Sequence, residues 1–131
     1  MTPRIREALP QDLPLIRSSW HLSYLRSYAN KRIPWAIYRP GQEARIAKLM
    51  ARSLLHVAYL DEVPDEILGW SAVDGEVLHY IYVRGIYRRK GIGSALVPEG
   101  TRYYTHQTNT AGGRFLAVHK LVFNPYQLEQ S

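Results

Sequence analysis

Residues 83–93, which read VRGIYRRKGIG, are the most informative segment of the sequence. It joins an apolar segment, residues 77–83, to the start of a predicted helix. Backbone N–H groups at the start of a helix, aided by the helix dipole, bind phosphate. Gly91 and Gly93 have no side chain that would block a close approach. Positive charge is added by Arg88, Arg89 and Lys90. The stretch therefore predicts a site for a phosphorylated ligand.

Two other phosphate-binding loops do not match this stretch. The P-loop requires Gly-Lys followed by Ser or Thr, and the dinucleotide fingerprint requires Gly-x-Gly-x-x-Gly. Neither pattern is present in residues 83–93. The ligand is therefore expected to be neither a nucleoside triphosphate held by a P-loop nor a dinucleotide held by that fingerprint.

The residues upstream of the loop predict antiparallel strands. Residues 77–83 are apolar and aromatic throughout, which is typical of a central strand buried on both faces. An Asp-Gly pair at 74–75 precedes it and is a strong hairpin signal, so residues 67–73 form the partner strand. A further strand is predicted at 56–60, followed by an acidic turn at 61–65.

Two helices are predicted nearer the N-terminus, after a short strand at 5–8. A turn is predicted at 39–41, which reads Arg-Pro-Gly, and a second helix at 42–55. The first helix is indicated by helical spacing of the residues Leu13, Ile16, Trp20 and Tyr24.

Downstream of the loop, Pro98 and Gly100 limit the length of the helix that follows it. A strand at 103–108, a helix at 111–120 and a final strand at 121–123 are predicted next. This order of elements predicts an α/β fold, a mixed, mostly antiparallel central sheet flanked by helices. A chain of 131 residues is expected to form a single domain over 1–131.

Composition narrows the classes of protein and partner. The net charge of +6 is uneven: residues 1–55 carry ten Lys or Arg and three acids, whereas residues 56–79 carry six acids and no Lys or Arg. This balance is consistent with an anionic ligand. The chain has no cysteine, which excludes disulfides and cysteine-ligated metal, and no metal site is predicted. Without an apolar membrane span or signal core, a cytoplasmic protein with no membrane partner is expected.

The pattern Arg88-x-x-Gly91-x-Gly93 resembles the (Gln/Arg)-x-x-Gly-x-(Gly/Ala) motif of the GNAT (Gcn5-related N-acetyltransferase) superfamily. Tyr87 and Lys90 also stand where common members of that superfamily have them, and the resemblance covers about residues 4–123. It implies a GNAT-like fold and an acyltransferase that uses acetyl-CoA as acyl donor. The pyrophosphate of acetyl-CoA would then be held by Arg88, Arg89, Lys90, Gly91, Ile92, Gly93 and Ser94.

The same resemblance gives the strand before the loop a second role. In the superfamily this strand parts from the next one, and its free backbone groups pair with the pantetheine arm. Here those residues are Ile81, Tyr82 and Val83. One such N–H group polarises the thioester carbonyl, a contribution of typically ~3 kcal/mol per donor. Asn109 is expected to contact the cofactor, as an asparagine of the family often does.

The catalytic base departs from the family pattern. Some members place a glutamate early in the strand, at the position of Val77 here. His79 is the first substitute, because side chains alternate along a strand and an imidazole titrates near neutrality. Glu76 is the second, one residue from Val77. The C-terminal end of the strand at 77–83 would lie at the thioester, so we expect the side chain of His79 to point into the acceptor cleft.

The acid that would protonate the leaving thiolate is also displaced. The family often has a tyrosine in the helix after the parted strand, where this chain has Phe115. Tyr126 is the nearest downstream candidate. Further alternatives are Tyr103, Tyr104 and His106.

Three functions remain open from the sequence. The first is acetyl-CoA-dependent N-acyl transfer by direct transfer to an amine of a small molecule or protein. The second is a GNAT-like enzyme that modifies a nucleic-acid base, suggested by the basic balance and by aromatic residues for stacking. The third is a non-catalytic CoA-binding module, suggested by the missing glutamate and tyrosine. The aromatic residues of the second hypothesis are Trp20, His21, Tyr24, Tyr28, Trp35 and Tyr38. For the assembly, a homodimer is one alternative.

Overall fold

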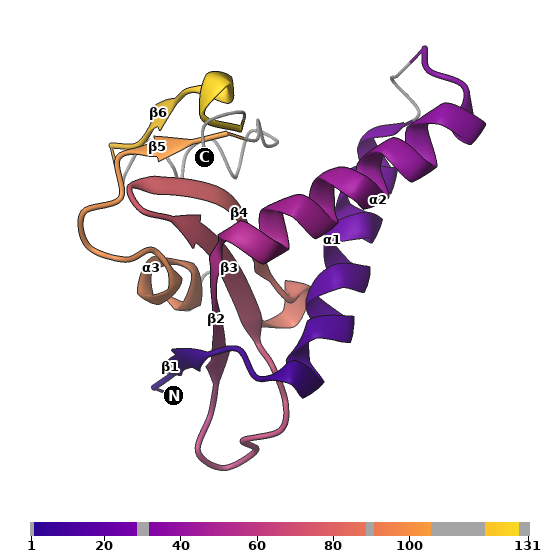
Figure 1. Cartoon of the computed structure of the whole chain (residues 1–131). Helices are drawn as coiled ribbons and strands as arrows, with labels where there is room; N and C mark the ends of the chain where they lie inside the picture. Colours follow the sequence, from indigo (N-terminus) through magenta and orange to yellow (C-terminus); the bar gives the residue numbers. More distant parts are fainter. Residues whose placement is uncertain (1, 29–31, 89–90, 106–119, 129–131) are drawn as a thin grey trace.

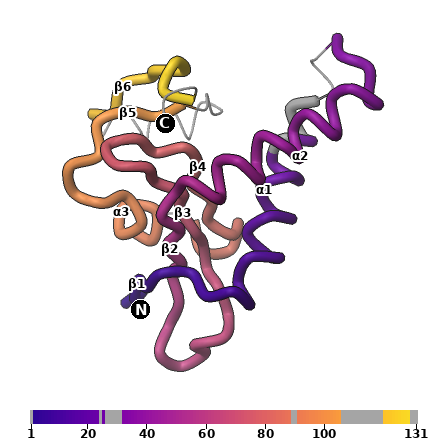
Figure 2. The backbone as a smooth tube through the Cα atoms, viewed as in Figure 1, coloured from indigo at the N-terminus to yellow at the C-terminus, as the bar shows by residue number. Residues whose placement is uncertain are grey.

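The structure is a computed structural model that describes residues 2–28, 32–88, 91–105 and 120–128 (Figures 1 and 2). Its strands and helices, in chain order, are β1 (Arg4–Glu7), α1 (Leu13–Tyr28), α2 (Trp35–Arg52), β2 (Leu54–Tyr59), β3 (Gly69–Asp74), β4 (Val77–Val83), α3 (Ile92–Leu96), β5 (Tyr103–Tyr104) and β6 (Val122–Phe123). Single-turn 3₁₀ helices are η1 (Pro10–Asp12), η2 (Gly85–Tyr87) and η3 (Pro125–Leu128). The helix predicted at 111–120 lies almost wholly outside the described residues.

The described strands form one mixed sheet in the order β1-β2-β3-β4-β5-β6. The pairs from β1 to β4 are antiparallel, whereas β5 runs parallel to β4 and β6 runs parallel to β5. The Asp-Gly hairpin is confirmed, with Gly75 at a φ of +61° between β3 and β4. The predicted fold class, a mixed and mostly antiparallel sheet flanked by helices, is therefore confirmed, with β4 in a central position.

Helices α1 and α2 cover one face of the sheet (Figure 1). Their buried side chains meet those of β2 and β3 in the main core, where Trp70 stacks between Tyr80 and Tyr82 with ring centroids 5.6 and 6.2 Å away. Trp20 lies 5.1 Å from Trp70 and is fully buried. The indole Nε1 of Trp70 donates a 2.8 Å hydrogen bond to the hydroxyl of Ser19 on α1. This aromatic stack fixes α1 against the half of the sheet that contains β4.

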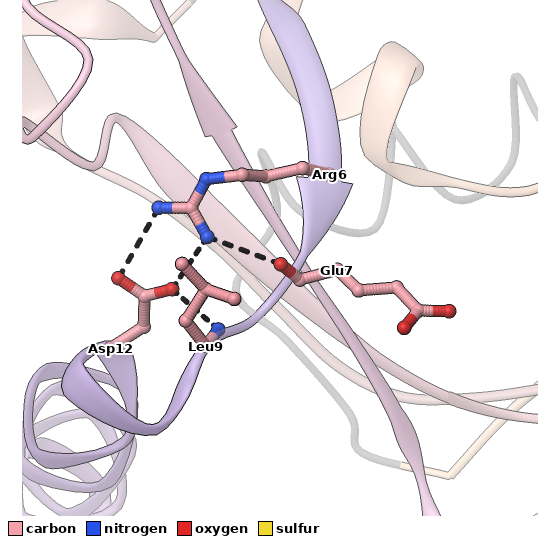
Figure 3. A network of polar contacts seen from close by, with 4 residues as sticks. All are labelled: Arg6, Glu7, Leu9 and Asp12. Atoms are coloured by element: carbon pink, nitrogen blue, oxygen red, sulfur yellow. Dashed lines mark hydrogen bonds and ion pairs between the residues drawn. The ribbon is translucent and has the colours of Figure 1, made fainter.

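The junction of β1 with α1 is held by a buried carboxylate (Figure 3). Asp12 accepts a 2.6 Å bond from Arg6 Nη1 and a 2.7 Å bond from the backbone N–H of Leu9. Burial raises the pKa of Asp12, but the bonds from Arg6 and Leu9 outweigh it and hold that pKa below its usual value. Asp12 is thus charged and fixes the angle at which the chain enters α1.

The turn predicted at 39–41 is wrong, because those residues lie inside α2. The apolar face of this helix includes Tyr38, Ile46 and Leu49, which are buried at helical spacing across the proline. Pro40 removes one backbone hydrogen bond, but it faces outward, and packing of this face continues the helix through it. The local signal of Pro-Gly was therefore outweighed by tertiary packing.

Helix α3 lies on the opposite face of the sheet (Figure 1). Ile92 and Leu96 are each 1% exposed and pack on Ala58 and Leu68. Gly69 permits this approach, since a Cβ there would lie 2.5 Å from the Tyr82 carbonyl oxygen and 3.3 Å from Leu96. The helix is short, as Pro98 and Gly100 predicted, and it ends at Leu96.

Within the part of the chain that the structure describes, no helix is both long and apolar enough to cross a membrane.

Candidate functional site

The centre of the candidate site is the C-terminal half of β4. At its start β4 pairs with β5, Val77 with Tyr103 and Leu78 with Tyr104, and the Thr105 N–H donates to the Leu78 carbonyl at 3.2 Å. Beyond Leu78, the described residues give β4 no strand partner on the side away from β3, which we call the parted side.

The ladder between β3 and β4 decides which backbone groups face the parted side. The N–H of Arg84 donates to the Leu68 carbonyl at 2.9 Å, and antiparallel ladders alternate between bonded and non-bonded pairs. Ile81, opposite Ser71, and Val83, opposite Gly69, are therefore in non-bonded pairs. Their N–H and C=O groups point away from β3, as the predicted contact with a pantetheine arm requires.

Tyr82 differs from its two neighbours in this respect. It stands opposite Trp70 in a hydrogen-bonded pair, so its backbone groups point to β3. Its side chain stacks on Trp70 in the core. Because the sheet uses the backbone groups of Tyr82, the predicted backbone contact with a pantetheine arm is expected from Ile81 and Val83.

The glycine loop leads from β4 through η2 into α3. Gly91 has a φ of +82°, a left-handed conformation that favours glycine, and it precedes the first residue of α3. The N–H groups of Ile92 and Gly93 lie in the first turn of α3, where a helix supplies no internal acceptor. Ser94 is exposed on the same turn. Arg89 and Lys90 lie outside the described residues.

Arg88 is exposed and folds back onto the end of β4. Its Nε donates a 3.0 Å hydrogen bond to the Val83 carbonyl, which is one of the groups directed to the parted side. The loop and the parted strand are therefore joined by a direct contact. This bond could not be predicted, because the motif defines only the position of Arg88 and not the direction of its side chain.

His79, the first candidate base, lies in a β-bulge. Ala72 is opposite Tyr80 and Val73 is opposite Leu78, so His79 is the extra residue of β4. The bulge interrupts the strict alternation from which we predicted the direction of its side chain. The ring is 1% exposed, and its Nδ1 lies 3.0 Å from the Thr105 hydroxyl.

The electrostatic environment of His79 keeps its ring neutral. Burial, strengthened by the positive charge of Arg52 and partly offset by Asp74, lowers the pKa of His79 to about 4. Arg52 itself pairs with Asp74 at 3.0 Å. The Nε2 atom is buried and has no hydrogen-bond partner among the described residues. The acidic limb near neutrality that an unperturbed histidine would give is therefore moved to about pH 4.

The other predicted catalytic side chains lie apart from this buried cluster. The side chain of Glu76 is 58% exposed and lies 3.9 Å from Arg102. Tyr126 is 76% exposed in η3. The structure shows no hydrogen bond from either side chain to His79 in the described part of the chain. Asn109 and His106 lie outside the described residues.

Sequence reasoning missed the partners of His79. Thr105 is 26 positions away in the sequence, and Arg52 is the last residue of α2. No motif connects these residues. Only the β-bulge and the parallel pairing of β5 bring them together.

Two of the described aromatic side chains near the N-terminus belong to the core. Trp20 is fully buried and Tyr38 is 6% exposed, whereas Trp35, stacked on Tyr38 at 6.0 Å, is 44% exposed. A stacking platform for a nucleic-acid base would need exposed ring faces, so Trp20 and Tyr38 are not available for one. The side chains of Tyr24 and Tyr28 lie outside the described residues.

Three of the solved structures that share this fold are named as acetyltransferases. The PaiA N-acetyltransferase of Thermoplasma acidophilum, in complex with coenzyme A, is 20% identical, with a TM-score of 0.56 over 91% of this chain and 89% of that one. A possible acetyltransferase from Clostridium difficile 630 is 19% identical, with a TM-score of 0.55 over 93% and 91%. A GCN5-related N-acetyltransferase from Rhodopseudomonas palustris is 19% identical, with a TM-score of 0.51 over 91% and 68%.

The chain therefore has the GNAT fold, and the resemblance predicted from residues 88–93 is confirmed at the level of the fold. By sequence alone, no protein family and no curated protein matches the chain.

Proposed function

We propose that this chain is an N-acyltransferase, a single domain over residues 1–131, that transfers the acetyl group of acetyl-CoA to an amine. The observation that carries the proposal is that, among the described residues, the C-terminal half of β4 has no strand partner on the side away from β3, beside the glycine loop. The backbone groups of Ile81 and Val83 are directed to the parted side, where a pantetheine amide has the geometry to replace a strand. The loop at 88–93 supplies the adjacent anion site.

The reaction requires few groups from the protein. The neutral amine nitrogen attacks the thioester carbonyl carbon, an amide bond forms, and the carbon–sulfur bond breaks. The proton of the amine passes to a base or to water, and the thiolate leaves and is protonated. A backbone N–H of β4 aimed at the carbonyl oxygen would stabilise the developing charge.

Direct transfer from acetyl-CoA to the amine is part of the proposal. It is supported by the lack of a cysteine that could carry the acetyl group as a thioester intermediate. Both substrates are therefore expected to bind together before chemistry. Initial rates measured over a grid of both substrates should give intersecting double-reciprocal lines, whereas parallel lines would contradict direct transfer.

The experiment that tests the proposed function has two stages. Calorimetry should first show binding of CoA at micromolar protein, and no binding up to millimolar CoA would overturn the proposal. A panel of small amines, polyamines and peptides is then incubated with acetyl-CoA, and release of free thiol is followed. Release that depends on one class of amine identifies the acceptor.

A non-catalytic CoA-binding module is the second candidate. It is favoured by the buried Val77 at the usual position of the base, and by the burial of His79. CoA binding without thiol release on any amine would support it. If His79 is the base, His79→Ala should lower turnover at least about tenfold, with CoA affinity within about threefold of the parent.

A further inference from the structure

Glu66 lies in the acidic loop between β2 and β3 and contacts the glycine loop that leads from β4 into α3. Its Oε1 accepts a 3.0 Å bond from Arg84 Nη1 and a 2.9 Å bond from the Tyr87 hydroxyl. These two donors lie on either side of the exposed turn at Gly85 and Ile86. One carboxylate oxygen thus holds both ends of η2.

The segment has few other restraints of its own. The Tyr87 N–H donates to the Arg84 carbonyl at 2.9 Å, and the Arg88 N–H reaches the Gly85 carbonyl only at 3.3 Å. Ile86 is 68% exposed. The hydrogen bonds to Glu66 therefore restrain both ends of η2 through side chains.

Tyr87 transmits this restraint to α3. Its ring packs against the cluster that contains Ile92 and Leu96, and the Arg84 guanidinium lies 5.8 Å from the ring centroid. The hydrogen bond to Glu66, followed by burial, raises the pKa of the Tyr87 phenol above its usual value. The phenol therefore stays protonated and continues to donate to Glu66.

We infer that Glu66 is a positioning residue for the glycine loop. It fixes Arg84 and Tyr87, and through them it sets the path by which the chain leaves β4 and enters α3. This inference rests on the proposed function, because it takes residues 88–93 as the site that binds the pyrophosphate of CoA.

A negative charge beside an anion site makes the test decisive. If Glu66 acted only through its charge, it would repel the phosphates, and its removal would tighten CoA binding. If it positions the loop, removal of the carboxylate group weakens binding. Glutamine keeps an acceptor oxygen in the same place, so it should restore binding under the positioning role.

The experiment measures CoA affinity by calorimetry for the full chain and for single variants. Glu66→Ala should raise Kd about tenfold, and Tyr87→Phe, which removes one of the two bonds, about threefold. Glu66→Gln should stay within about twofold of the parent. Glu62→Gln is the matched control: it removes the same charge from the same loop, has no hydrogen bond among the described residues, and should also stay within twofold.

Steady-state kinetics and unfolding curves complete the test. Glu66→Ala should raise KM for acetyl-CoA while kcat and KM for the amine change less than twofold, a split that general destabilisation does not produce. Unchanged or tighter CoA binding in folded Glu66→Ala would overturn the positioning role while leaving the proposed function intact. Absence of CoA binding in the parent would overturn both. Should Glu66→Ala unfold, Tyr87→Phe with parental affinity would overturn the positioning role.

Discussion

Acidification should destabilise this protein through His79. The folded state holds its ring buried and lowers its pKa to about 4, whereas the unfolded chain restores a value near 6.5. Above pH 6.5 the ring is neutral in both states and contributes nothing to the pH dependence. As pH falls from 6.5 to about 4, the unfolded chain takes up a proton that the folded state refuses.

The size of the effect follows from the two pKa values. A difference of one pKa unit corresponds to about 1.36 kcal/mol, so His79 should lower the free energy of unfolding by roughly 3 kcal/mol by pH 4. That is a large part of the stability of a domain of this size, typically about 5–15 kcal/mol. Carboxylates such as Asp12 add to the loss at lower pH.

The assay is urea unfolding at pH 7, 5.5 and 4, followed by circular dichroism. The control is His79→Gln, because glutamine retains a partner for the Thr105 hydroxyl and does not titrate. Protonation of carboxylates should lower the free energy of unfolding by the same amount in the parent and in the variant. The parent should therefore lose roughly 3 kcal/mol more than the variant between pH 7 and pH 4.

Equal losses in the two proteins would contradict the lowered pKa of His79. Equal losses would mean that the ring of His79 titrates in the folded state as it does in the unfolded chain. Proton NMR titration of the His79 ring gives an independent check, with an expected midpoint near pH 4.

Three other outcomes are expected. Gly93→Glu should abolish CoA binding in calorimetry without loss of fold, because a carboxylate would face the phosphates; parental affinity would show that the loop is assigned wrongly. Amide exchange should be slow at Tyr80, which donates to β3, and faster at Ile81, with Ile81 slowed when CoA is added; equal rates without CoA would contradict the ladder. Asp12→Asn should cost about 2 kcal/mol in urea unfolding, because it leaves Arg6 without its charge partner; a loss under about 0.5 kcal/mol would contradict that role.

Much of the fold could be predicted because its signals are local. The Asp-Gly hairpin, the apolar strand at 77–83 and the glycine loop each depend on neighbouring residues, and each was placed correctly. Pro40 misled the prediction because the buried face of α2 is defined by contacts with distant residues. Local turn chemistry has no information about that packing.

The site was less predictable for the same reason. A β-bulge at His79 depends on how β3 and β4 align, and the two strands carry no sequence mark of the extra residue. The state of a histidine depends on burial and on charges such as Arg52, which the chain brings from another element. The prediction of a base near neutrality therefore could not anticipate a pKa of about 4.

The parted side of β4 has a consequence for solubility. The sheet of the described residues ends at β1 and β6, and within those residues the parted side of β4 also lacks a strand partner, which gives it the character of a strand edge. Exposed edges recruit strands from other molecules and promote aggregation. Arg88 occupies the Val83 carbonyl and removes one acceptor from this edge, and the bulge at His79 distorts its regular spacing. A pantetheine arm bound there would complete the blocking of the edge, so saturation with CoA should slow aggregation of the folded protein on storage.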